Sequence, residues 1–279
     1  MPKRNPRPDS FVSINPLAKI DVAEAETKAE IIRAKGKLEI TELEVRGLQR
    51  MVYEEGKNQA NIEAITAKAI PHLSDTAEPQ KLDEDFVRYL FDKAKLVSND
   101  EMQELWAKIL ANEANTAGSF SRRSMDLVSQ MSRRDAELFT RFVRNVWIID
   151  TPTPVIPETH AFPAEDGLSL DFTALQHLES IGLVSYAGAA SYCKFGFGKT
   201  ARIYYYGCPV DIEFQNESNN QFQVGKALLT VTGVELANIS GATPSIAAFE
   251  RALEYLVDQN VAVSLPCSAK HAYLTLRNL

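Results

Sequence analysis

The longest unbroken pattern in the chain is the run from Leu17 to Ile70, which contains no proline. Ala, Glu, Lys, Ile and Leu dominate it, and only Gly36, Gly47 and Gly56 interrupt it. These residue types favour helix, so the run predicts either one very long helix or two helices joined near Gly56. A helix with a narrow apolar stripe needs a partner, because most helical stability comes from packing that stripe.

The apolar residues of this run follow a heptad pattern when Leu17 is placed at position a. The large apolar residues at positions a and d are then Leu17, Ile20, Ile31, Leu38, Val45, Leu48 and Val52. Polar residues interrupt the stripe, including Glu24 at a and Thr27, Thr41 and Glu55 at d. These polar residues interrupt the a and d positions too often for a strong long coiled coil. The apolar stripe is nevertheless the surface that the sequence leaves without a partner inside the chain. These seven residues are therefore the predicted oligomerisation surface.

The rest of the chain divides by composition into further segments. Residues 1–16 carry four prolines and several positive charges, which predicts a disordered basic arm before the helical segment 17–73. Residues 82–149 have the spacing of a small helical bundle, with helices over 83–96, from Ser98, over 121–131 and from Ser132. Ser98 and Glu101 fit a capping box. Trp106 and Phe139 are predicted core residues.

Three prolines at positions 152, 154 and 157 predict the clearest boundary, because each fixes its own backbone and disfavours helix in the residue before it. Residues 158–279 then alternate between helical patterns and short β-branched or aromatic runs bounded by glycine. Helices are expected over 171–182, 232–239 and 245–258, and strands over 192–195, 201–206, 210–214, 223–230 and 261–265. The predicted fold class is α+β, with a long N-terminal amphipathic helix, a small helical bundle and a mixed C-terminal domain.

Composition limits the classes of function. The net charge is −7, from 37 acidic and 30 basic residues, which disfavours nucleic acid as a partner unless the positive charges cluster. No apolar run reaches the length of about 18 residues that a membrane span needs, and the N-terminus lacks a signal-peptide pattern, so we expect a cytoplasmic protein without a membrane partner. Cys193, Cys208 and Cys267 have no metal-site or disulfide-framework spacing and are expected to be reduced.

Two short motifs resemble the winged-helix family. The first is carried by Leu175, Leu178, Gly182, Leu183 and Val184, and the second by Leu229, Thr230, Gly233, Glu235 and Leu236. The resemblance implies a winged-helix-like domain over 158–279. A winged helix that reads DNA needs basic or amide side chains on its recognition helix, and residues 171–183 contain no Lys or Arg.

A second resemblance covers the helical part. Its segments are Asn61–Ile65, Ser98–Ala111, Gly118–Ser121 and Ser132–Phe139, which are similar to the bacterial family filed as domain of unknown function 2806. More distantly, the chain resembles proteins named for abortive infection of the alpha type. That likeness implies a role in phage defence.

No familiar catalytic, cofactor-binding or metal-binding arrangement is predicted. Gly196–Thr200 ends like a phosphate-binding loop but lacks its first glycine, and His72, His160, His177 and His271 have no metal-ligand spacing. Basic residues offer a candidate nucleic-acid or anion contact, namely Arg122, Arg123, Arg133, Arg134, Lys194, Lys199 and Arg202.

The leading hypothesis is a non-enzymatic bacterial interaction or regulatory protein that forms a homo-oligomer through the long helix and binds another protein. A second hypothesis is a DNA-binding winged-helix regulator that uses the basic arm, the arginine pairs and the wing. A third is a toxin or enzyme whose site is assembled from scattered residues, with His160 as one candidate.

Overall fold

The computed structural model describes residues 16–157, 170–188 and 190–266, with side chains from Thr27 onward. The chain divides into two compact units, one ending at Asn58 and one beginning at Gln59. The fold is mixed, with helices followed by antiparallel strands, which confirms the predicted α+β class. His160, Cys267, His271 and nearly all of the predicted basic arm lie outside the described residues.

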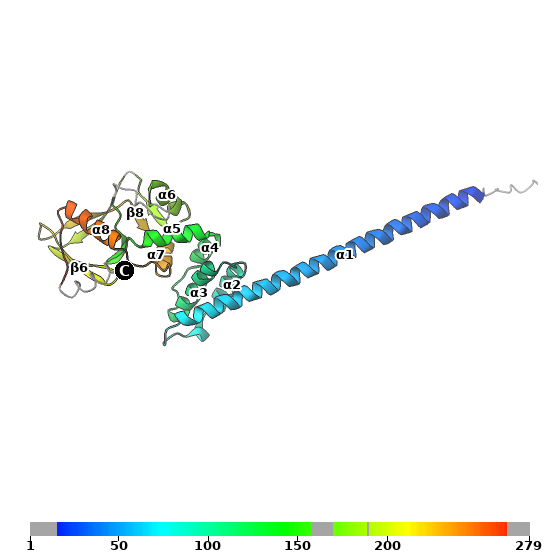
Figure 1. The fold of residues 1–279 in the computed structure, drawn as a ribbon, viewed down its shortest axis with the longest axis horizontal. Helices are drawn as coiled ribbons and strands as arrows, with labels where there is room; N and C mark the ends of the chain where they lie inside the picture. The colour runs from blue at the N-terminus through cyan, green and yellow to red at the C-terminus, as the bar shows by residue number, and fades with distance from the viewer. Residues whose placement is uncertain (1–15, 158–169, 189, 267–279) are drawn as a thin grey trace, which may run out of the picture. The chain divides into compact units, whose positions relative to one another are not determined.

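The run without proline forms one helix, α1 (Pro16–Ala69), of 54 residues (Figure 1). Gly56 does not break it, and the space beside Gly56 is open, since an added Cβ would meet nothing within 4 Å. At a rise of 1.5 Å per residue the helix is about 80 Å long. It passes into a single 3-10 turn, Ile70–His72, at Pro71.

The segment after α1 is helical, as the spacing predicts. Its elements are a 3-10 turn (Pro79–Lys81), α2 (Glu84–Ala94), α3 (Asp100–Asn115), α4 (Arg122–Gln130) and α5 (Arg133–Val143). Each of the four α-helices begins with a side chain that accepts a backbone N–H, which satisfies a donor that the helix leaves open.

The predicted capping box at Ser98 is wrong by one residue. Asn99 is the N-cap of α3, because its side-chain oxygen accepts from the Met102 N–H at 3.0 Å. The Ser98 hydroxyl instead accepts a hydrogen bond from Asn61. A complete capping box occurs at α5, where Ser132 and Asp135 exchange hydrogen bonds.

The second half of the described chain contains nine short strands and three helices. The strands are β1 (Val146–Ile149), β2 (Thr151–Pro154), β3 (Val184–Tyr186), β4 (Tyr192–Phe197), β5 (Thr200–Tyr205), β6 (Cys208–Glu213), β7 (Asn220–Gly225), β8 (Ala227–Leu229) and β9 (Ala262–Ser264). The helices are α6 (Phe172–Ser180), α7 (Val231–Ala237) and α8 (Ile246–Asp258).

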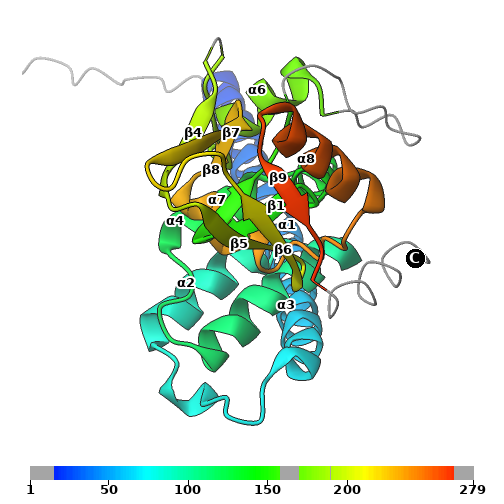
Figure 2. The same ribbon diagram turned by 90° about the vertical axis from the view of Figure 1, so that its left-hand side faces the viewer.

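The strands form one larger sheet and two small ones. The larger sheet has the order β2-β1-β5-β6-β9, and β3 pairs with β8 while β4 pairs with β7. Figure 2 shows β5, β6 and β9 side by side, with α8 next to β9. β5 and β6 form a hairpin whose turn, Tyr206 and Gly207, has positive φ at both residues, the geometry that suits a two-residue hairpin turn.

Strands β1 and β2 were not among the predicted elements. Pro152 and Pro154 lie within β2, where they face Ile148 and Val146 of β1. Proline has no N–H to donate, and it is tolerated here because β2 is the edge strand of its sheet. The proline-rich segment therefore contributes a strand as well as a change of composition.

Two apolar clusters form the core of the unit that begins at Gln59. The first joins the end of α1 and helices α2–α5 to α6, β3, β8 and α7, and it contains the predicted core residues Trp106 and Phe139. The second lies between the larger sheet and α8. Its centre is aromatic, with the Trp147 and Phe249 rings stacked at 5.4 Å and Tyr205 beside both.

The second winged-helix motif has a structural explanation at the junction of β3 and α7. Thr230 caps α7 by accepting the Gly233 N–H, and its own hydroxyl donates to the Gly182 carbonyl at 2.7 Å. Gly233 then passes so close to β3 that an added Cβ would lie 2.0 Å from the Leu183 carbonyl oxygen. This position requires glycine for steric reasons.

Gly233→Ala should therefore lower the free energy of unfolding by about 2–3 kcal/mol, because the backbone of β3 must move to admit a methyl group. Chemical denaturation followed by circular dichroism measures this. The matched control is Gly56→Ala, which has open space and should leave stability unchanged or raise it by up to about 1 kcal/mol. Equal effects of the two substitutions would contradict the steric explanation.

Candidate interaction surface and polar network

The exposed part of α1 carries an unusual number of large apolar side chains. Their exposed fractions run from 48% at Val45 to 73% at Tyr53. They are Ile31, Ile32, Leu38, Ile40, Leu43, Val45, Leu48, Met51, Val52 and Tyr53. A single exposed apolar residue is ordinary, whereas a contiguous set marks an interaction surface.

Burial along α1 changes abruptly at Asn61. From Thr27 to Ala60 no described side chain is buried, whereas Asn61, Ile65 and Ala69 are buried within the compact unit. The two stretches of one helix therefore have different sources of stability. Residues 61–69 pack inside their own unit, and residues 27–60 have no comparable burial among the described residues.

Five predicted oligomerisation residues, Ile31, Leu38, Val45, Leu48 and Val52, are among the exposed apolar set. Four of them repeat every seven residues, so on a straight helix each is displaced by only about 20° from the one before. They form one stripe, which we call the heptad stripe, with Leu48 on its flank. The side chains of Leu17 and Ile20 lie outside the described part.

A second stripe on the same helix lies outside the heptad pattern. Ile32 and Leu43 are eleven residues apart, as are Ile40 and Met51, and eleven residues are close to three full turns. At about 100° per residue Ile32, Ile40 and Leu43 point away from the heptad stripe, whereas Met51 lies about 60° from Leu48, at its edge. The eleven-residue spacing was the signal that could have revealed them.

A polar residue at a seam position is compatible with burial when its hydroxyl is satisfied locally. Thr41 occupies a d position, and its Oγ1 donates to the Lys37 carbonyl at 2.9 Å within the helix. A hydroxyl bonded in this way needs no further donor or acceptor from a partner. Thr41 therefore interrupts the apolar stripe at a smaller free-energy cost than an unbonded polar group.

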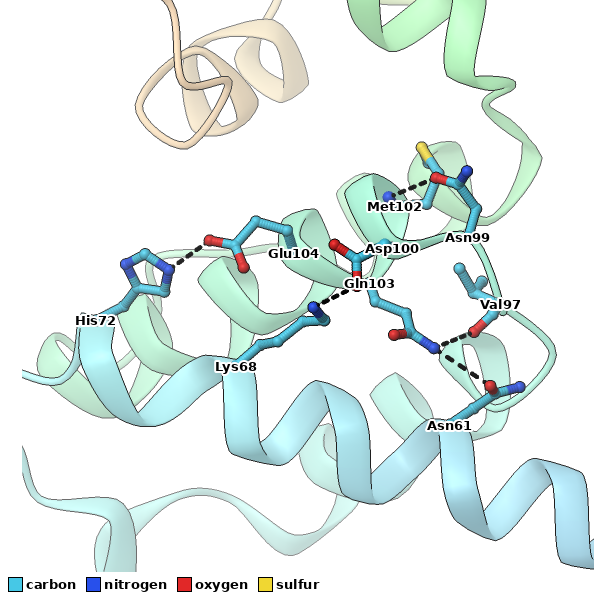
Figure 3. A network of polar contacts seen from close by, with 9 residues as sticks. All are labelled: Asn61, Lys68, His72, Val97, Asn99, Asp100, Met102, Gln103 and Glu104. Atoms are coloured by element: carbon cyan, nitrogen blue, oxygen red, sulfur yellow. Dashed lines mark hydrogen bonds and ion pairs between the residues drawn. The ribbon is translucent and has the colours of Figure 1, made fainter.

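The buried end of α1 is joined to α3 by a polar network (Figure 3). Asn61, which is 7% exposed, donates to the Lys95 carbonyl at 2.7 Å and accepts from Gln103 Nε2 at 3.2 Å. Gln103, equally buried, also donates to the Val97 carbonyl at 2.9 Å. The two amide side chains thus satisfy backbone carbonyls between α2 and α3 that would otherwise lack partners.

An ion pair and a histidine–carboxylate contact extend this connection along α3. Lys68 Nζ lies 2.6 Å from Asp100, and His72 Nε2 lies 2.6 Å from Glu104 (Figure 3). The carbonyl of His72 also accepts from Asn115 at 3.0 Å, at the far end of α3. Residues 61–72 are therefore tied to α3 along its whole length.

The three basic residues predicted on the wing are all engaged within the chain. Lys194 donates to the Ile149 carbonyl and Lys199 pairs with Glu217 at 2.8 Å. Arg202 makes two hydrogen bonds to Asp211, and these lower the pKa of that carboxyl group. Lys194 lies on β4 and Arg202 on β5, which belong to different sheets.

The predicted arginine pairs around α4 also differ from one another. The Arg122 guanidinium lies over the Tyr89 ring at 5.2 Å. Arg133 Nε lies 2.8 Å from both Glu101 and Glu137. All four arginines are exposed.

One group of polar residues has the composition of a catalytic triad but not its arrangement. Asp135 accepts from Ser132 Oγ at 2.8 Å and contacts His177 Nε2 at 2.6 Å. The carboxylate lies between the serine and the histidine, so the histidine is not placed to take the serine proton. Burial opposes ionisation of Asp135, but the hydrogen bonds from His177 and Ser132 outweigh it and lower its pKa.

Within the described ranges, no group of three or more His, Cys, Asp or Glu side chains could hold a metal ion, and Cys193 and Cys208 are free thiols. In those ranges there is also no helix whose length and apolar character would let it cross a membrane.

The molecule is an α+β protein in which a long helix with an exposed apolar surface continues into a compact unit. It belongs to the family described as Protein of unknown function (DUF2806), whose model matches residues 45–253. This match confirms the resemblance carried by the helical segments. No curated protein and no solved structure matches the chain. The winged-helix likeness and the role in phage defence remain predictions.

Asn61→Ala should lower the free energy of unfolding by about 2 kcal/mol, because the Lys95 carbonyl and the Gln103 amide lose a buried partner. Asn58→Ala is the matched control, one turn earlier on the same helix. Among the described residues the Asn58 side chain bonds only exposed Glu55, at 3.4 Å, and its loss should change stability by less than about 0.5 kcal/mol. Urea denaturation of both variants tests the network, and equal midpoints would contradict its role.

Proposed function

We propose that this chain is a homo-oligomeric interaction protein whose copies associate through the heptad stripe of α1. The observation that carries the proposal is the exposure of Ile31, Leu38, Val45, Leu48 and Val52 on one side of a helix. A stripe of this kind is stabilised when an equivalent helix covers it and its side chains interdigitate.

The charges beside the heptad stripe favour a second copy in parallel orientation and in register. In that arrangement a residue at position g faces the residue at position e five places later on the other helix. Glu30 then faces Lys35 of a second copy, and Lys37 faces Glu42 of a second copy. Both pairs are attractive and both repeat on the two sides of the seam.

The expected strength follows from the area of the stripe. Covering five half-exposed apolar side chains on each of two copies gains roughly 10 kcal/mol, at about 1 kcal/mol for each half-buried group. Losing the free motion of two molecules costs a similar amount, about 4–15 kcal/mol. The association is therefore expected to depend on protein concentration.

Assembly through α1 gives the compact unit a use in binding. Several copies of residues 59–279 held together bind a partner with repeated sites more tightly than one copy does, without any new contact. This is the sense in which we propose an interaction protein, with another protein as its partner.

Leu38→Glu combined with Val45→Glu should dissociate the oligomer, because it places two carboxylates of each copy in an apolar seam. We expect the dissociation constant to rise by at least about hundredfold. Light scattering coupled to size-exclusion chromatography, run over a series of protein concentrations, measures the mass directly.

The matched control is Ile40→Glu combined with Leu43→Glu, which adds the same charge to the same stretch of the helix but on the second stripe. This variant should keep the oligomeric mass. If the control variant were monomeric and the Leu38→Glu/Val45→Glu variant stayed oligomeric, the copies would associate through the second stripe. A monomeric unsubstituted chain at every concentration would refute the proposal itself.

A further inference from the structure

A cavity of about 460 Å³ lies in the compact unit among α3, α5 and α7. Its apolar wall includes Met102, Leu105, Phe139, Leu236 and Ile239. The volume falls in the range of cavities that hold small organic molecules. None of the residues on the heptad stripe takes part in it, so it is independent of the proposed association.

The acidic groups of the cavity already have partners. Glu101 and Glu137 both lie 2.8 Å from Arg133 Nε. Glu104 lies 2.6 Å from His72 Nε2. The three carboxylates that line the cavity are thus each held by a basic side chain.

Two cationic residues of the same cavity lack such a counterpart. Lys108, on α3, and Arg144, at the end of α5, are both half-buried, and among the described residues neither forms an ion pair. Arg144 Nε is also buried without a hydrogen-bond partner in that part of the chain. The Lys108 ammonium lies next to Gly241, 3.5 Å from the place that a Cβ would occupy.

Burial removes water from a charge, and an oppositely charged group can replace the lost water. The chain has more acidic than basic residues, yet none of the three carboxylates that line the cavity forms an ion pair with Lys108 or Arg144. The apolar wall beside the two cations matches a molecule that has an apolar body and one negatively charged end.

We propose that this cavity is a binding site for a small organic anion, with its charged group held by Lys108 and Arg144 and its apolar body against Leu105 and Phe139. Arg144 supplies planar N–H donors that suit a carboxylate, sulfonate or phosphate group, and Lys108 supplies a point charge. The second winged-helix motif contributes Leu236 to the wall.

The probe for this site is 8-anilinonaphthalene-1-sulfonate, an aromatic anion whose fluorescence rises on entering an apolar cavity. Titration of the full-length protein should show saturable binding of one molecule per chain. Lys108→Met and Arg144→Met should each weaken binding about tenfold, the expected loss of one charge-assisted contact. Lys199→Met, which removes a lysine far from the cavity, should leave binding unchanged.

N-phenyl-1-naphthylamine has the same rings without the sulfonate and separates charge recognition from apolar binding. Its affinity should not change in the Lys108 and Arg144 variants. If the anion binds equally to both variants and to the unsubstituted chain, or if the neutral compound loses affinity in parallel, the proposal is overturned.

The apolar stripes of α1 offer the dye a competing surface, so the Leu38→Glu/Val45→Glu variant is titrated as well. It should bind the anion as the unsubstituted chain does, and loss of binding there would overturn the assignment to the cavity. Thermal unfolding monitors folding of every variant. If Arg144→Met does not fold, the affinity of the Lys108→Met variant for the anion tests the proposal alone.

Discussion

The stability of a long helix in water depends on covering its apolar side chains, and α1 meets this requirement over only part of its length. Ile65 and Ala69 are buried in the compact unit, and the hydrogen bonds between Asn61 and Gln103 fix that end of the helix against α3. Residues 31–53 instead expose large apolar groups over about six turns. Because helix propensity contributes little over such a length, a partner for these residues accounts for the helix better than α1 alone does.

The compact unit obtains its stability in the ordinary way, from side-chain caps and two apolar clusters. Many of its polar side chains form hydrogen bonds that join one helix to another. The Asp135 carboxylate joins α5 to α6 through His177, and Glu235 of α7 accepts hydrogen bonds from Ser121 and Ser124 of α4. Lys108 and Arg144 of the cavity differ from these groups because neither forms an ion pair among the described residues, so the cavity and not these clusters carries a proposal for ligand binding.

Sequence patterns predicted the elements whose signals are local. The long helical run, the helices of the second segment and the two strands that flank Gly207 all follow from propensity and spacing. Strands β1 and β2 escaped because two prolines in four residues normally argue against a strand, and only the position at a sheet edge makes them acceptable. Asn99 and not Ser98 caps α3, and the Ser98 hydroxyl instead contacts Asn61, 37 residues away in sequence, a tertiary contact that local spacing does not show. The cavity brings α3, α5 and α7 together, and no spacing within the chain could have shown that Lys108 and Arg144 share it.

A parallel, in-register arrangement makes one strict geometric demand, that identical residues of two copies face one another along the seam. Leu48 at position d is the most direct probe. In a Leu48→Cys variant, mild oxidation tests whether the two substituted positions lie close enough to form a disulfide. Cysteines at facing positions have the short Cα separation that a disulfide needs. We expect a covalent dimer from this variant, and none from Leu43→Cys at the second stripe or from the unsubstituted chain with its native cysteines. A Leu48→Cys variant that stays monomeric on denaturing gels, while Leu43→Cys is linked, would contradict association through the heptad stripe.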